Sequence, residues 1–210
     1  MSDPDLPADL PGDPTGGALA TDDLDTDPAL AAAVLEIEGH VASAGWDQPG
    51  RLYALVDTAR LVAREPSLAA DAGLDDASAA GSLTPVEQDQ LPRERALEEM
   101  LAEIAWPDEV AGCAAVVERW VLPPTADEQI PADAAEAEAF AAAHPDRQEV
   151  RIVAGVTRAG AAYCALRLRA HDEEQSVVTG PELVPGLLEL LQTTLDDPSG
   201  HRSDTEEPLP

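Results

Sequence analysis

Two neighbouring segments near the C-terminal end of the chain carry apolar side chains at every second position. In residues 149–157 these are Val150, Ile152, Ala154 and Val156. In residues 161–170 they are Ala162, Cys164, Leu166 and Leu168. A period of two is typical of a β-strand that buries one face. The two segments are therefore predicted to form an antiparallel hairpin.

The loop between the segments decides the register of this hairpin. A two-residue loop would turn one apolar set toward the wrong side, whereas the three-residue loop 158–160 keeps both sets on one face. A loop of that length ends in a left-handed residue, and Gly160 occupies the position. The predicted pairs are Ile152 with Leu166, Val150 with Leu168, Glu149 with Arg169, and Tyr163 with Gly155.

One amphipathic helix is predicted before the strands in the sequence, and a second one after them. Asp27-Pro28 has the residues of a helix start, and Gly45 those of a helix end. Between them a stripe at helical spacing consists of Leu30, Val34, Ile37 and Val41. A second stripe near the C-terminus consists of Leu183, Leu187, Leu190, Leu191 and Leu195. Each apolar stripe requires a buried partner.

The remaining segments complete an expected α+β domain. Strands are predicted at 51–57 and 111–122, and short helices at 58–65 and 93–104. The capping-box spacing after Thr84 and after Thr179 indicates two further helix starts. We expect an antiparallel sheet of about four strands (51–57, 111–122, 149–157 and 161–170), with the N- and C-terminal helices packed on one face.

The expected domain is single and spans residues 28–195. Flexible insertions are predicted at about 67–83 and 125–143, where the chain is rich in Ala and acidic or small residues. The acidic tails 1–27 and 196–210 are predicted to be disordered.

The net charge of the chain limits the kinds of molecule that it can bind. The chain has 42 Asp and Glu against 12 basic residues, all of them Arg, and a net charge of −30. Such a surface repels nucleic-acid phosphates and anionic lipid, and it favours cationic partners. Residues 1–27 lack the features of a signal peptide, and no segment has the ~20 apolar residues of a membrane helix. We expect a cytoplasmic protein with reduced Cys113 and Cys164 and with no cofactor.

A first candidate site lies at the open end of the predicted hairpin. The register brings His144 and Asp146 level with His171 and Asp172. Imidazole and carboxylate groups that converge can bind a metal ion or perform acid–base chemistry. The alternative is that both stretches are solvated connections, which are rich in charge because the whole chain is.

A second candidate site is the polar face of the hairpin, where Arg151, Arg167 and Arg169 are expected to point outward. Arginine recognises carboxylates and phosphates through paired hydrogen bonds, so this face could bind an anion or an acidic peptide. The alternative is internal compensation by Glu149 and by Glu118 on a neighbouring strand. Because Arg151 and Arg167 face each other, a ligand or a structural Glu must neutralise them.

The large aromatic residues offer a third feature. Trp120, with Trp46 and Trp106, either forms a surface on which a ligand stacks or fills the edge of a core that is short of bulk. His40 on the first helix is expected to be a half-buried structural imidazole.

Four stretches give the chain a resemblance to a conserved single-domain family of unknown function in actinobacteria. They are GWDQPGRLYALV (45–56), WPDEVAGCAAVVERWVLP (106–123), HPDRQEVRIVAGVTRAG (144–160) and TGPELVPGL (179–187). The resemblance implies one folded domain and brings no activity, cofactor or catalytic residue. The order of elements also resembles small chaperone-like α+β domains of type III secretion, which pack helices on one face of a sheet and often dimerise.

The function expected from these observations is that of a non-enzymatic protein-binding or adaptor domain, with a protein partner or a second copy bound to it. One alternative is an enzyme that uses His171, Asp146 and Asp172. Another is an acidic mimic of nucleic acid, which the net charge of −30 suggests.

Overall fold

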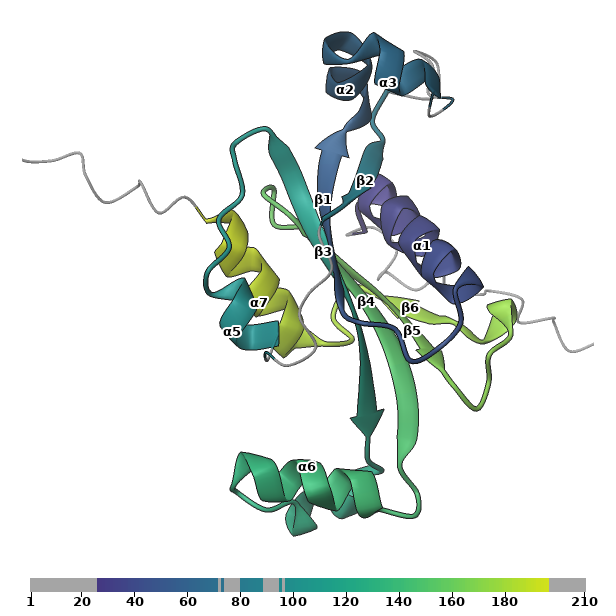
Figure 1. Cartoon of the computed structure of the whole chain (residues 1–210), viewed down its shortest axis with the longest axis vertical. Helices are drawn as coiled ribbons and strands as arrows, with labels where there is room; N and C mark the ends of the chain where they lie inside the picture. The colour runs from purple at the N-terminus through teal and green to yellow at the C-terminus, as the bar shows by residue number, and fades with distance from the viewer. Residues whose placement is uncertain (1–25, 72, 74–79, 89–94, 96, 197–210) are drawn as a thin grey trace, which may run out of the picture.

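An open antiparallel sheet of six strands runs the length of the molecule (Figure 1). The computed structural model describes residues 26–71, 73, 80–88, 95 and 97–196, so the disorder predicted for the tails lies almost wholly outside the described residues. The strand order is β2-β1-β3-β4-β5-β6. The strands are β1 (Arg51–Asp57), β2 (Leu83–Glu87), β3 (Val110–Val121), β4 (Gln148–Thr157), β5 (Ala162–Leu168) and β6 (Val178–Gly180).

Both edge strands were missed by sequence reasoning, which expected helix starts at Thr84 and Thr179. Thr84 instead pairs with Val56 of β1, and Thr179 pairs with Ala165 of β5. The amide of Gln88 bonds to β1, so the odd positions of β2 face the open edge. Pro85 therefore removes no bond to β1, and an edge strand tolerates it.

The predicted hairpin is confirmed in its strands, loop and register. Val150 pairs with Leu168, and Ile152 with Leu166. Gly160 has φ 86°, and the amide of Thr157 donates to the carbonyl of Ala161 at 2.9 Å. The alternation of apolar residues together with one glycine was enough to determine this part of the fold.

The first helix is also confirmed. It is α1 (Pro28–Ser43), and the Asp27 carboxylate accepts from the amides of Ala29 at 2.9 Å and Leu30 at 3.3 Å. The last helix, α7 (Pro185–Leu195), begins later than the sequence suggested. The shorter helices are α2 (Thr58–Arg64), α3 (Pro66–Asp71), α5 (Leu97–Leu101) and α6 (Ala134–Ala143). None of the described helices combines the length and apolarity needed to cross a bilayer.

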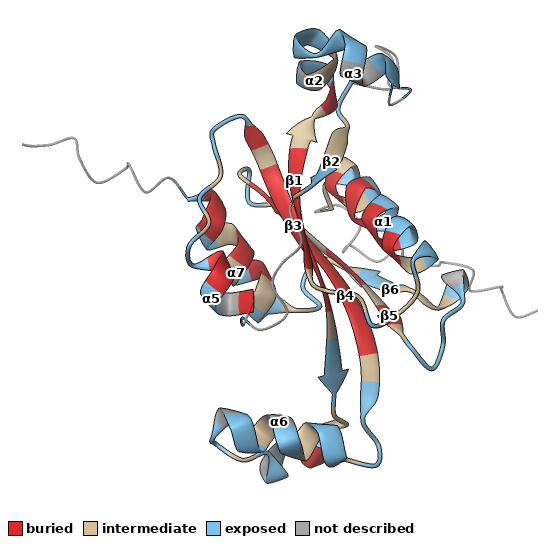
Figure 2. Cartoon of the chain, in the orientation of Figure 1, coloured by how far each residue is buried: buried red, intermediate tan, exposed pale blue. Residues whose placement is uncertain are grey.

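The expectation that α1 and α7 share one face of the sheet is wrong, because they cover opposite faces (Figure 1). One core cluster joins α7 to Leu52, Cys113, Ile152 and the other strand residues that alternate with them on the same face of the sheet. The other joins α1 to strand residues on the opposite face, namely Tyr53, Leu55, Ala114, Val116, Val153 and Ala165. Figure 2 shows the central strands buried between these two helices.

Gly155 allows α1 to pack on the face of the sheet that the sequence predicts to be polar. A Cβ atom at this position would lie 2.8 Å from Cγ2 of Val34 and 3.1 Å from Cδ1 of Leu30, so only glycine leaves room for the helix. With a helix on each face, the molecule also differs from the small chaperone-like domains that the element order resembled.

Candidate functional site

The arginines of the hairpin do not point outward as expected. Arg151 and Arg167 are 1% and 3% exposed beneath the α1 side of the sheet. Arg167 donates to both carboxylate oxygens of Glu38 on α1, at 2.6 and 2.7 Å. Arg151 donates to Glu118 on β3 at 2.9 and 3.2 Å. A structural Glu therefore neutralises each guanidinium, and a soluble anion has no direct access to either.

Arg169 is the exposed member of the set, and it fastens the loop that follows α1. Its guanidinium pairs with Asp47 at 2.9 Å and with Glu149 at 2.8 Å. The guanidinium groups of Arg151 and Arg169 also lie 4.3 and 5.6 Å from the ring centroid of Trp46. These contacts hold the loop against the sheet.

Three carboxylates beside this loop lie close enough to hold a metal ion. Oxygen atoms of Asp47, Glu118 and Glu149 lie within 4.8 Å of one another. Arg169 already pairs with Asp47 and Glu149, and Arg151 with Glu118. Glu118 also accepts from the amide of Asp47 at 2.8 Å. The chemistry of the cluster is that of an ion-pair network.

The residues at the open end of the hairpin are placed separately by local contacts. His144 ends α6, and its Nδ1 accepts from the amide of Asp146 at 3.1 Å. His171 follows β5 and is exposed, and the carbonyl of Asp172 accepts from Arg167 at 3.0 Å. Within the described part of the chain, none of these four residues joins a cluster with metal-ligand geometry.

The tryptophans divide between the core and the surface. Trp106 packs against the α7 cluster, and its Nε1 donates to Oγ1 of Thr194 at 3.0 Å. Trp120, near the end of β3, is 45% exposed and carries the guanidinium of Arg147 at 4.7 Å from its ring centroid. Trp106 thus fills the core edge, whereas Trp120 lies at the surface with Arg147 on its ring.

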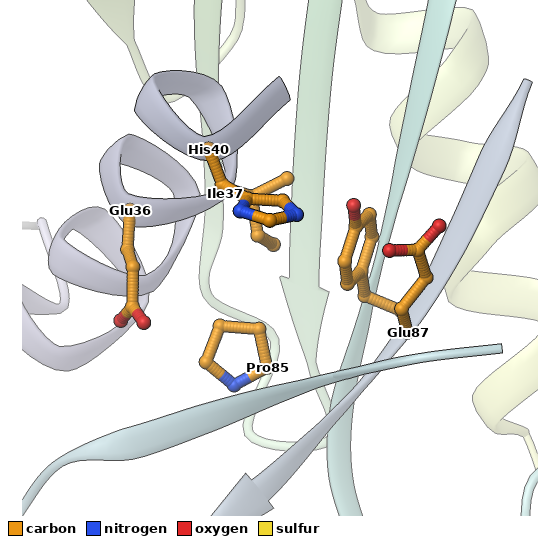
Figure 3. A pocket seen from close by; sticks show the side chains of 6 residues that line it. Glu36, Ile37, His40, Pro85 and Glu87 are labelled. Carbon is orange, nitrogen blue, oxygen red and sulfur yellow. The ribbon is translucent and has the colours of Figure 1, made fainter. Parts of the chain in front are cut away.

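A cavity of about 190 Å³ lies between α1 and the edge of the sheet formed by β1 and β2. Figure 3 shows Glu36, Ile37 and His40 on the helix, with Pro85 and Glu87 across from them. Tyr53 of β1 completes the lining. Two carboxylates, an imidazole and a phenol thus line one small space.

The Tyr53 hydroxyl gives this cavity its most unusual feature. The residue is 3% exposed, and its oxygen makes no hydrogen bond of ordinary geometry with a described residue, although Arg51 and Glu87 lie close enough to influence its proton. Burial raises the pKa of Tyr53 above its ordinary value, and the charge of Glu87 adds to the effect. The phenol is therefore neutral at physiological pH, and its oxygen can accept a hydrogen bond from a ligand. A buried polar group without a partner costs stability, which makes it a candidate binding group.

The charges around the cavity favour a cation. Arg51 of β1 pairs with Glu87 at 3.3 Å and compensates that carboxylate. Glu36 has no ion pair within the described ranges, so its negative charge faces the cavity uncompensated. A bound group with one positive charge would balance it.

Sequence reasoning missed this cavity for two reasons. His40 was expected to be half-buried and structural, yet it is exposed and lines the cavity. Pro85 and Glu87 were read as the first turn of a helix, which hid the strand that carries them. The available signal was Tyr53, the one residue with a hydroxyl in the apolar run 52–56.

The fold and the cavity define a small α+β protein with an open antiparallel sheet, a helix on each face and a polar pocket at one edge. Comparison with known families shows that the chain belongs to the PPA1309-like protein family, whose model matches residues 30–196. Neither a curated protein nor a solved structure matches the chain. The family is uncharacterised, so the function has to be argued from the site.

Proposed function

We propose that the protein is a non-enzymatic binding protein, and that the pocket between α1 and β2 takes up the ammonium group of a lysine side chain on a protein partner. The observation that carries this proposal is the buried, unpartnered hydroxyl of Tyr53 in a cavity with the uncompensated carboxylate of Glu36. An ammonium group has three N–H donors and no acceptor. Carboxylate and hydroxyl oxygens are the acceptors that such a group needs.

The dimensions and the electrostatics of the pocket agree with this ligand. A cavity of about 190 Å³ is small for a whole metabolite and suits the end of an extended side chain. Ile37 and Pro85 supply apolar walls for the methylene groups of lysine. The net charge of −30 attracts basic partners over distances of about a Debye length, ~8 Å at physiological salt.

Calorimetric titration of the full chain tests the proposal. N-acetyl-lysine methylamide should bind, whereas N-acetyl-norleucine methylamide, which has the same chain without the charge, should not. Putrescine is titrated as a separate control ligand. If it binds at least tenfold more tightly than the lysine derivative, the ligand is a free diamine and the protein-partner proposal is wrong.

Two substitutions locate the binding. Glu36→Gln should weaken the lysine derivative about fivefold through the loss of a partly exposed charge pair. Tyr53→Phe should weaken it about tenfold or more, through the loss of one charge-assisted hydrogen bond from the ammonium group. Glu189→Gln makes the same charge change on the exposed side of α7 and should leave affinity unchanged. Equal weakening in Glu36→Gln and Glu189→Gln, with no effect of Tyr53→Phe, would show that only the net charge matters.

A further inference from the structure

A second cavity, of about 300 Å³, opens on the opposite face of the sheet, beneath α7. Its apolar lining comes from α5, β3, β4 and α7 and consists of Leu97, Val117, Ile152, Leu187 and Leu190. Leu187 and Leu190 are only partly buried although they belong to the apolar stripe of α7. Their outer surfaces therefore face the cavity.

Gly186 in the first turn of α7 is an exposed part of the lining of this cavity. A Cβ atom at position 186 would meet nothing within 4 Å, and the residue has no positive φ that would require glycine. Glycine lowers helix stability relative to alanine. The rim of the cavity therefore carries no side chain at this position, at a cost to the helix.

Arg119 is the one charged residue in the lining of the cavity. It is exposed, and its one described hydrogen bond is a long contact of 3.4 Å to the backbone carbonyl of Glu118. In the ranges that the structure describes, no carboxylate pairs with its guanidinium, although acids outnumber bases 42 to 12 in the chain. The planar guanidinium is free to bind a carboxylate with two parallel hydrogen bonds.

We infer that this cavity binds an amphipathic carboxylate, with its alkyl chain among the leucines and its head group on Arg119. The combination of an apolar cavity and one directed polar group is typical of small-molecule sites. Each buried methylene contributes about a fourfold gain in affinity, so a medium-length chain overcomes the screened repulsion from the acidic surface. This ligand differs in charge and in location from the ammonium group proposed for the pocket at α1.

Titration of the full chain with decanoate and with decanol tests the inference. Decanoate should bind about tenfold more tightly than decanol, because only the acid can pair with Arg119. Arg119→Gln should remove this difference and leave the affinity for decanol unchanged. Arg147→Gln, the same charge change at an exposed arginine on Trp120, should preserve the difference.

A third variant adds a bulky side chain at the rim of the cavity. Gly186→Leu places its side chain in open space, so the midpoint of thermal unfolding should not fall while binding of both ligands is lost. The inference is overturned if decanoate does not bind to the wild type, if decanol binds equally well, or if a folded Gly186→Leu variant binds as the wild type does.

Discussion

Among single residues, the buried charges beneath α1 have the largest energetic consequence. Glu38 is 4% exposed and lies on the apolar side of the helix, four residues after Val34. Its position in that stripe was a sign, visible in the sequence, that a buried base would face it. Arg167 is that base, and the pair resolves the like-charge contact with Arg151 that the hairpin register requires.

Glu38→Ala should lower the free energy of unfolding by about 3–5 kcal/mol, because it removes the buried counter-charge of Arg167 and leaves the exposed carboxylate of Asp172, at 3.8 Å, in its place. Urea denaturation followed by circular dichroism measures the change. The double variant Glu38→Met with Arg167→Met should recover most of the loss, since a well-packed apolar pair can replace a buried ion pair. A loss below about 1 kcal/mol in Glu38→Ala would contradict the burial of this pair.

The thiol of Cys113 should make stability depend on alkaline pH. Burial raises the pKa of Cys113 from 9.0 to about 11. The folded state therefore holds this proton more tightly than the unfolded state, so the stabilisation is complete below about pH 9 and is lost as the pH rises through about 11. Two pKa units correspond to about 3 kcal/mol.

Denaturation in urea at a series of pH values from 8 to 11 checks this expectation. The chain contains no Lys, so few other groups titrate in the interval. Burial also raises the pKa of Cys164 and of Tyr53, and both add to the loss in the same direction. Cys113→Ala should make the decline shallower, and an unchanged slope would show that this thiol is not buried in solution.

At the scale of the elements, close packing between α1 and β4 sets the position of the helix. Gly155→Ala should lower the free energy of unfolding by about 1–3 kcal/mol, because the new methyl group overlaps Val34. Gly39→Ala on the same helix meets nothing within 4 Å and should raise stability by about 0.5–1 kcal/mol. Thermal or urea unfolding should show that Gly155→Ala lowers the stability and Gly39→Ala raises it. If both substitutions stabilise the protein, α1 does not pack against Gly155.

The elements also show which parts of the fold can be read from the sequence. The hairpin and α1 were predictable because their signals are local: a period of two, a helical stripe, an Asp cap and one glycine in a turn. The edge strands β2 and β6 were not, because each is short and takes its conformation from hydrogen bonds to a neighbouring strand. The capping-box residues at Thr84 and Thr179 are equally compatible with a turn or strand end when no helix follows.

On the scale of the whole molecule, the two-sided burial of the sheet decides where ligands can bind. A polar face on the hairpin was expected because three arginines lie on it, but Glu38 and Glu118 allow two of them to be buried under α1. The binding sites that we propose therefore lie in the cavities beside the helices and not on the hairpin. Those cavities depend on contacts between β2, α1, α5 and α7, which are distant in sequence, so no local pattern could place them.

The most direct test of the account is an NMR measurement of intermolecular nuclear Overhauser effects between the full chain and N-acetyl-lysine methylamide. We predict effects from the ε-methylene protons of the ligand to the ring of Tyr53 and to the side chain of Ile37. Effects confined to residues of the α7 face, or to the exposed ring of Trp120, would contradict the proposed pocket.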